Sequence, residues 1–169
     1  MARSDKTRVG LIADTHGLLR PEARAFLLGA DHIVHAGDIG ERGILDELHS
    51  IAHATAVRGN NDTAPWAAQL RDTELLRVSK VCIYVIHNLA DLRIDPAAAG
   101  AQIVVSGHSH RPMLERRDGV LFVNPGSAGP RRFKLPIAAG ELLIEGRSAR
   151  ARIVDLANSR LIARLSGSI

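Results

Sequence analysis

Cysteine, aromatic residues and long hydrophobic runs are scarce in this sequence, and each shortage excludes a class of protein. The 169 residues include one cysteine, Cys82, which rules out an internal disulfide and a thiolate zinc cluster. Uninterrupted apolar runs reach about six residues, whereas a membrane helix needs roughly 20. The apolar stretch 9–13 near the N-terminus is followed at once by Asp14, which is unlike a signal peptide. We therefore expect a cytoplasmic protein that does not bind a membrane.

The charge is unevenly distributed along the chain. The formal net charge is +4, and residues 111–169 contain 11 basic against 5 acidic residues. Such a basic segment can attract phosphates or nucleic acid, although an arginine-rich solvated surface explains it equally well. Aromatic residues make up only 3% of the chain, so nucleic acid, whose bases stack on aromatic rings, is a possible but not a favoured partner.

Length and hydrophobic patterning predict a single α/β domain over residues 1–169. Strands are expected at 9–13, 32–36, 54–57, 75–78, 81–86 and 103–105, and helices at 21–28, 44–50 and 96–100. Beyond this point the pattern changes to short strands separated by turns, at 113–115, 120–123, 137–144 and 148–154. A largely parallel first half joined to an antiparallel second half predicts two packed sheets flanked by helices.

Polar residues follow five of the expected strands at their carboxyl ends. They are Asp14 with His16, Asp38, Asn60 with Asp62, His87, and His108 with His110. Ligands of open α/β sheets bind at this edge. In extended backbone, a spacing of two residues places both members of a pair on one face. Carboxylate, imidazole and amide donors without thiolate suit Mn, Fe, Zn or related divalent ions, and Asp38 is the natural bridge between two of them.

The series Asp-x-His, Gly-Asp, Gly-Asn-x-Asp, a strand-end His and Gly-His-x-His resembles the calcineurin-like metallophosphoesterase superfamily. Together with residues 124–127 (Asn-Pro-Gly-Ser), it is most similar to small bacterial and archaeal phosphodiesterases of the YfcE and MJ0936 type. The resemblance implies a two-sheet β-sandwich with helices on both outer faces. It also implies two divalent metal ions, one held by Asp14, His16, Asp38 and His110 and the other by Asp38, Asn60, His87 and His108.

The activity implied by the resemblance is metal-dependent hydrolysis of a small phosphodiester or nucleotide-like substrate. A hydroxide between the ions would attack phosphorus in line while both ions neutralise the phosphoryl oxygens. Mn²⁺ is the first expectation for the metal, with Fe, Zn, Ni or Co as alternatives. The candidate catalytic residues are Asp38, Asn60, Asn61, Arg58, Asp62 and His108, and Arg58 is the best candidate for binding a substrate phosphate.

Two positions depart from the family pattern. Many relatives have a histidine after the Gly-Asn pair that can protonate the leaving group, whereas Asn61 can donate a hydrogen bond but no proton. The His-Gly-His of the family is here His87, Asn88 and Leu89. These departures leave open a scaffold protein on the same fold, of which the retromer subunit is an example. The basic C-terminal third leaves a nuclease as a further alternative. A homo-oligomer is also possible.

Structural interpretations compete with functional ones at single residues. Asn60 could be an ordinary turn residue and His87 a buried structural histidine. We expect His35 to support the site from behind and residues 124–127 to support its edge. Solvated charge is the default interpretation of Arg131 and Arg132, with phosphate binding as the alternative, while His32, His49 and His53 are expected on the surface.

Overall fold

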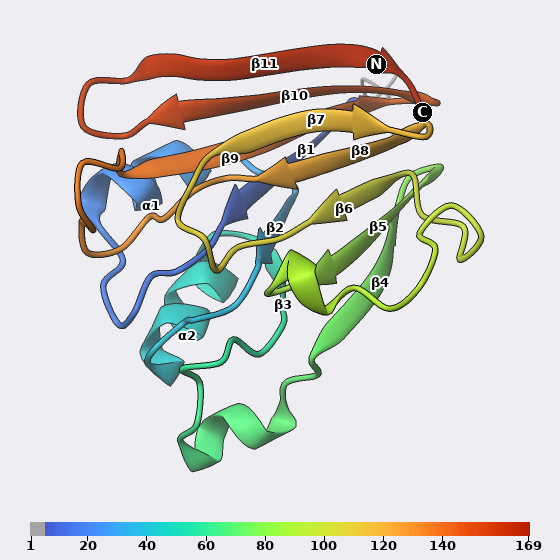
Figure 1. The fold of residues 1–169 in the computed structure, drawn as a ribbon. Helices are drawn as coiled ribbons and strands as arrows, with labels where there is room; N and C mark the ends of the chain where they lie inside the picture. The colour runs from blue at the N-terminus through green and yellow to red at the C-terminus, as the bar shows by residue number, and fades with distance from the viewer. Residues whose placement is uncertain (1–5) are drawn as a thin grey trace.

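Two β-sheets pack face to face in the computed structural model, which describes residues 6–169 (Figure 1). The first sheet has the spatial order β11 (Arg160–Ser168), β10 (Ser148–Asp155), β9 (Ala138–Glu145), β1 (Lys6–Ile12), β2 (His32–His35) and β3 (His53–Ala56). The second has the order β4 (Thr73–Val78), β5 (Val81–Ile86), β6 (Ile103–Val105), β8 (Val120–Asn124) and β7 (Met113–Arg117). The expected two-sheet architecture is confirmed.

Both sheets mix parallel and antiparallel pairs. Strands β1, β2 and β3 are parallel to one another, as are β5, β6 and β8. Strand β9 then returns to pair antiparallel with β1, so the end of the chain extends the sheet that its beginning started. The division into a parallel first half and an antiparallel second half is therefore too simple, because each half of the chain contributes strands to both sheets.

Aliphatic side chains fill the space between the sheets and beneath the helices. Leu11 and Ile83, both fully buried, belong to the cluster between the sheets. Helices α1 (Pro21–Leu27) and α2 (Arg42–Ile51) cover the outer face of the first sheet with Leu27 and Leu48. The outer face of the second sheet is covered around the short 3₁₀ helix η2 (Leu89–Asp91), where Phe122 is buried. The αββα sandwich implied by the family resemblance is thus confirmed.

Three local features differ from expectation. The segment 96–100 forms one helical turn rather than a helix, because Gly100, with a φ of 84°, ends the turn that the Asp95 side chain begins. A 3₁₀ helix, η1 (Pro65–Gln69), follows the third strand, and the sequence analysis did not predict it. Strand β11 was also not predicted, because the apolar Ile162, the extra residue at a β-bulge opposite Ile153 and Val154, interrupts the alternation of apolar and polar residues.

None of the helices among residues 6–169 has both the length and the apolar content to cross a bilayer.

A buried carboxylate links three strands of the first sheet to helix α1, which packs on that sheet. Glu141 on β9 is 2% exposed and lies 2.5 Å from the Nε atoms of both Arg8 and Arg152. Arg8 also donates to the carbonyls of Leu28, at 2.9 Å, and Phe26, at 2.6 Å, which lie at the C-terminal end of α1. Burial would raise the pKa of Glu141, but the two guanidinium groups outweigh it and lower that pKa.

Replacing Glu141 should therefore destabilise the fold in a pH-dependent way. We expect Glu141→Gln to lower the free energy of unfolding by about 3 kcal/mol at neutral pH, because it leaves Arg8 partly buried without its counter-charge. In the folded protein the pKa of Glu141 lies below the ordinary value of 4.5. The stabilisation by Glu141 is therefore fully present above pH 4.5 and is lost as the pH falls through the lowered pKa. Urea denaturation at several pH values measures it.

The matched control is Glu145→Gln on the same strand. Glu145 pairs with Lys6 at 3.4 Å with both side chains 60% exposed, and such pairs contribute at most about 1 kcal/mol. Equal destabilisation by the two substitutions, or a difference that persists in acid, would contradict the assignment of a stabilising charge network to Glu141.

Candidate metal centre

The structure brings all seven predicted metal ligands to the carboxyl ends of five strands. Asp14 and His16 follow β1, Asp38 follows β2, Asn60 follows β3, His87 follows β5, and His108 and His110 follow β6. Strands from both sheets contribute, so the ligands meet where the two layers open at one end of the sandwich. The convergence rests on the parallel direction of β1 to β3 and of β5 and β6.

The loops reach this arrangement through left-handed backbone rather than through extended strands. Five ligands have positive φ angles, namely Asp14 (55°), His16 (45°), Asp38 (56°), His108 (68°) and His110 (59°). Asp and His tolerate this region better than most residues, and such strained backbone gathers at functional sites. The argument from extended backbone was therefore wrong about the cause. His108 and His110 in fact turn toward two different groups of ligands.

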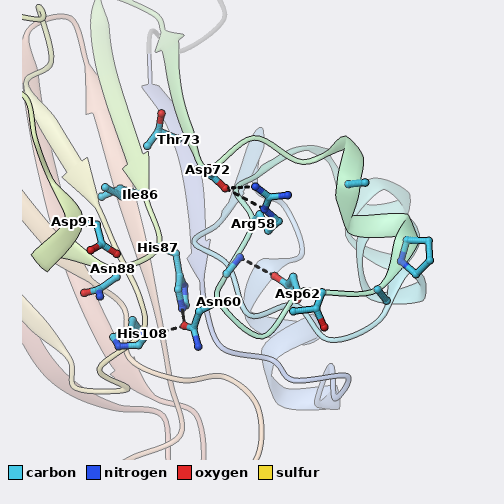
Figure 2. Close-up of a pocket in the computed structure, with 15 residues that line it drawn as sticks. Arg58, Asn60, Asp62, Asp72, Thr73, Ile86, His87, Asn88, Asp91 and His108 are labelled. Atoms are coloured by element: carbon cyan, nitrogen blue, oxygen red, sulfur yellow. Dashed lines mark hydrogen bonds and ion pairs between the residues drawn. The ribbon is translucent and has the colours of Figure 1, made fainter.

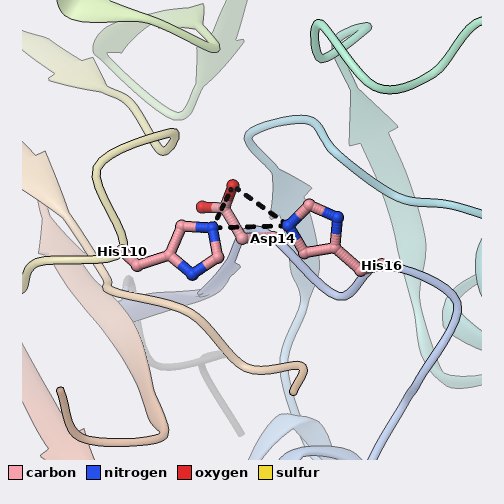
Figure 3. Close-up of side chains that lie close together, drawn as sticks. All are labelled: Asp14, His16 and His110. Atoms are coloured by element: carbon pink, nitrogen blue, oxygen red, sulfur yellow. Dashed lines mark hydrogen bonds and ion pairs between the residues drawn. The ribbon is translucent and has the colours of Figure 1, made fainter. Parts of the chain in front are cut away.

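The first group consists of Asp14, His16 and His110 (Figure 3). The Nε2 atoms of the two histidines are 3.3 Å apart. Asp14 Oδ1 lies 3.4 Å from Nε2 of His110 and 4.0 Å from Nε2 of His16. Asp14 is fully buried, and within residues 6–169 this oxygen has no hydrogen-bond partner.

The second group surrounds the amide oxygen of Asn60 (Figure 2). This Oδ1 atom lies 3.0 Å from His87 Nε2 and 2.9 Å from His108 Nδ1. Asp38 Oδ2 is 3.4 Å from His87 Nε2 and 3.8 Å from His16 Nε2, so this carboxylate stands between the two groups. The position is the one expected of a bridging ligand.

The ligand atoms of both groups are arranged better for binding divalent cations than for hydrogen-bonding to one another. His87 Nδ1 lies 2.7 Å from the Ala36 carbonyl and must donate its proton there, so Nε2 can donate to the oxygens of Asn60 and Asp38 only when the ring is a cation. A bound divalent ion would take the place of that second proton. Bonds of about 2.0–2.2 Å to a common ion separate neighbouring ligand atoms by roughly 3–3.5 Å, close to the spacing seen in both groups. Imidazole, carboxylate and amide oxygen suit Mn, Fe, Zn and related ions.

Neighbouring residues orient the ligands. The Gly37 N–H donates to Nδ1 of the buried His35, so His35 Nε2–H donates to Thr15 Oγ, which in turn donates to the Ile39 carbonyl. Asn124 donates to the Gly107 carbonyl at 2.8 Å, and the Ser127 hydroxyl donates to the Asp14 carbonyl at 3.0 Å. His35 and residues 124–127 therefore support the site from behind, as the sequence analysis expected.

Burial and neighbouring charges set the protonation of the site. Burial alone would raise the pKa of Asp38, but hydrogen bonds from His87 and Asn61 outweigh it and hold that pKa well below its usual value. Burial would lower the pKa of His87, but Asp38 and the Ala36 carbonyl raise it. Full burial lowers the pKa of His35 to about 3, so this ring is neutral at physiological pH. Asp38 is thus ionised whenever the protein is folded near neutrality.

Asn61 and Arg58, both predicted to be catalytic, form hydrogen bonds with carboxylates of the protein. Asn61 donates to Asp38 twice, from its backbone N–H at 2.8 Å and from its side-chain amide at 2.7 Å. Arg58 lines the cleft of about 800 Å³ beside Asn60, His87 and His108, and its Nη2 donates to Asp72 at 2.7 Å. Arg58 thus reaches the cleft already paired with a carboxylate.

Asp62 does not reach the ligand groups. Its two carboxylate oxygens accept the backbone N–H groups of Ile39 at 3.1 Å, Gly40 at 2.9 Å and Gly59 at 2.9 Å. This side chain joins the loop after β2 to the loop after β3. The structure therefore assigns Asp62 a positioning role in place of the expected catalytic one. The Gly-Asn-x-Asp motif identified Asp62 as a functional residue, but its carboxylate binds backbone N–H groups and not a metal ion or a substrate.

Backbone segments approach one another very closely around the two buried carboxylates. A Cβ atom at Gly59 would lie 2.1 Å from the backbone nitrogen of Asp38, and one at Gly129 would lie 2.4 Å from the carbonyl oxygen of Thr15. Only glycine fits where such contacts involve main chain. The loops that follow β2 and β3, and the loops that follow β1 and β8, are thereby packed without side chains between them.

Comparison with known proteins agrees with this geometry. Residues 7–145 match the calcineurin-like phosphoesterase superfamily domain. The chain belongs to the calcineurin-like phosphoesterase superfamily. It is 32% identical over 136 residues to the probable metallophosphoesterase MJ0623 of Methanocaldococcus jannaschii, covering 70% of this chain and 67% of that protein. It is 30% identical over 160 residues to the phosphodiesterase YfcE of Escherichia coli, covering 77% of this chain and 84% of YfcE.

Solved structures share the fold at lower identity. Vacuolar protein sorting 29 from Cryptosporidium parvum superposes with a TM-score of 0.83 at 19% identity, over 97% of this chain and 99% of that one. The superfamily and the sandwich predicted from the strand-end motifs are both confirmed.

The positioning role of Asp62 predicts a loss of metal affinity at a distance. Asp62→Asn replaces one acceptor oxygen with an amide that faces backbone N–H groups, so the loops after β2 and β3 should loosen. We expect affinity for Mn²⁺ to fall about 10- to 100-fold, since residues that orient metal ligands contribute on that scale. Isothermal titration with Mn²⁺ measures it.

Asp46→Asn on the exposed face of α2 is the control and should bind Mn²⁺ as the unaltered protein does. An unchanged affinity in Asp62→Asn would refute the positioning role.

Proposed function

We propose that residues 1–169 form one metallophosphoesterase domain that hydrolyses phosphodiesters with the help of two divalent cations, of which Mn²⁺ is the first expectation. Membership of the superfamily and 30% identity to a named phosphodiesterase support this proposal. The observation that supports it most directly is the fully buried Asp14 oxygen, which has no partner among the described residues and faces the nitrogens of His16 and His110.

We assign the ligands to two overlapping sets, the ones that the family resemblance implies, and the distances support this assignment. The first consists of Asp14, His16, Asp38 and His110, and the second of Asp38, Asn60, His87 and His108. When bound, such cations supply Lewis acidity toward the phosphoryl oxygens and lower the pKa of water toward neutrality. Asp38 belongs to both sets because its Oδ2 lies within 4 Å of a ligand nitrogen from each.

The residues of the chain itself orient the substrate. The cleft beside the second set is open to solvent and large enough for one arm of a small phosphodiester. Arg58 on its wall is the candidate for contact with a substrate phosphate, and Asp72 fixes the position of its guanidinium. Asn61 holds the Asp38 carboxylate in place but has no proton to give to a leaving group.

Asp38→Asn should abolish most of the activity. Losing the shared carboxylate weakens both ligand sets, and a loss of several kcal/mol in transition-state stabilisation corresponds to a decrease of about 100-fold or more in kcat/KM. The assay is Mn²⁺-dependent hydrolysis of bis(p-nitrophenyl) phosphate, together with the Mn²⁺ content of the dialysed protein. We expect two ions per chain in the unaltered protein and fewer in the variant.

The matched control for this experiment is His49→Ala, an exposed histidine on α2 outside both ligand sets. It should retain metal content and turnover. Absence of Mn²⁺-dependent hydrolysis in the unaltered protein would contradict the proposal. It would favour a protein-binding scaffold on the same fold, a role compatible with the shape shared with vacuolar protein sorting 29.

The absence of a proton donor at Asn61 predicts strong dependence on the leaving group. Turnover should fall steeply from p-nitrophenyl to alkyl phosphodiesters, because the alkoxide must depart without protonation. Asn61→His restores an ionisable group at this position, and general acid catalysis contributes roughly 10²- to 10⁴-fold where it operates. We expect at least about a tenfold gain with an alkyl ester.

A shallower dependence of log kcat on leaving-group pKa in Asn61→His, with a new alkaline limb in the pH profile where the histidine loses its proton, would confirm this. Parallel lines for the two proteins would show that position 61 does not protonate the leaving group.

A further inference from the structure

The loop between β8 and β9 exposes a phenylalanine among three cationic side chains. Phe133 is 92% exposed, and its neighbours Arg131, Arg132 and Lys134 are exposed as well. The N–H of Leu135 donates to the Arg132 carbonyl at 3.2 Å, which closes a tight turn over residues 132–135. Phe133 occupies this turn with a φ of 53°, an unfavourable angle for a bulky side chain. The turn therefore presents the ring to solvent despite backbone strain and lost apolar burial.

The other two phenylalanines of the chain are covered. The guanidinium of Arg8 lies 5.3 Å from the ring centre of Phe26, and that of Arg117 lies 4.9 Å from the ring centre of Phe122. No such cover over Phe133 exists within the described residues 6–169. Its ring face is free to receive a planar group.

The loop stands beside the first ligand group. At its base, Gly129 packs against the main chain of Thr15, and its carbonyl accepts from Arg20 Nε at 3.1 Å. Figure 1 shows this loop, in orange, on the same side of the molecule as the blue loop that follows β1. The loop that carries the turn is thus anchored against Thr15, which lies between the ligands Asp14 and His16 in the sequence.

The chemistry of the loop indicates the kind of ligand. Three positive charges within residues 131–134 attract an anion, and an exposed aromatic face stacks on a nucleobase. A nucleic acid strand presents both groups in every nucleotide. A protein partner would call instead for a contiguous apolar patch of several hundred Å², and here the neighbours of Phe133 are charged.

We propose that residues 131–134 bind the nucleotide adjoining the scissile phosphodiester, with Phe133 stacked on its base and Arg131, Arg132 and Lys134 facing its phosphates. The inference rests on the proposed phosphodiesterase function and narrows its substrate class to oligonucleotides and dinucleotide-like diesters. Aromatic residues are scarce in this chain, which made nucleic acid an unfavoured partner. Phe133 nevertheless supplies an exposed aromatic ring for stacking on this loop.

Fluorescence anisotropy tests the proposal without metal. The probes are a fluorescein-labelled single-stranded oligothymidylate of about six nucleotides and an abasic strand of the same length and charge, both measured in EDTA. We expect the unaltered protein to bind the base-containing probe about tenfold more tightly. Phe133→Ala should abolish that difference, and Phe133→Trp should retain it.

Two further variants separate charge from stacking. Arg132→Ala should weaken binding of both probes and reduce the slope of log affinity against log salt by about one. Leu75→Ala, which shortens a half-exposed apolar side chain on β4, should change nothing. Because Phe133 is almost fully exposed, its variants are expected to unfold at the same urea concentration as the unaltered protein.

Equal affinity of the unaltered protein for the two probes would overturn the proposal, as would preserved base dependence in Phe133→Ala. Base-dependent binding without Mn²⁺-dependent hydrolysis would mean that the proposed activity has failed while the binding loop is correct. Hydrolysis of bis(p-nitrophenyl) phosphate without base-dependent binding would mean the reverse.

Discussion

Nε2 of His16, Nε2 of His110 and a buried oxygen of Asp14 lie within 4.0 Å of one another, and that oxygen has no hydrogen-bond partner among the described residues. This convergence is the constraint that the rest of the architecture satisfies. Asp14 is fully buried, so its charge cannot be left to water, and the two facing nitrogens cannot both donate. The strand order, the strained loops and the network behind the site all hold these donors in place while leaving one side open.

The residues behind the site fix the orientation of the ligands, because some of their hydrogen-bonding atoms bond to the protein and the others are left to face the site. His87 and His35 each use one ring nitrogen on the protein behind them, which fixes the orientation of the other nitrogen. Asp62 makes its bonds entirely to main chain and so determines where Asp38 and Asn60 stand. A cation centre of this kind is stabilised as much by residues that never touch the ion as by its ligands.

Much of this site could be predicted from the sequence, because parallel strands deliver the residues after their carboxyl ends to a single edge. All seven proposed ligands were found in that way. The left-handed backbone of Asp14 and His110 could not be predicted, since it depends on contacts between loops far apart in the chain. The same holds for Asp62, whose partners are main-chain groups that no residue pattern encodes. Strand β11 was missed because Ile162, at a β-bulge, interrupts its alternation, and the exposure of Phe133 could be known only from the fold.

The tight main-chain packing at Gly59 and Gly129 limits how this site can evolve. No added side chain fits between the loops that meet there, so the inner ring of donors requires glycine at both positions. The outer segments have no such restriction, since η1 and the turn at residues 132–135 lie largely at the surface. New selectivity can therefore arise by lengthening or rewriting those outer segments, while the ion-holding ring stays fixed beneath them.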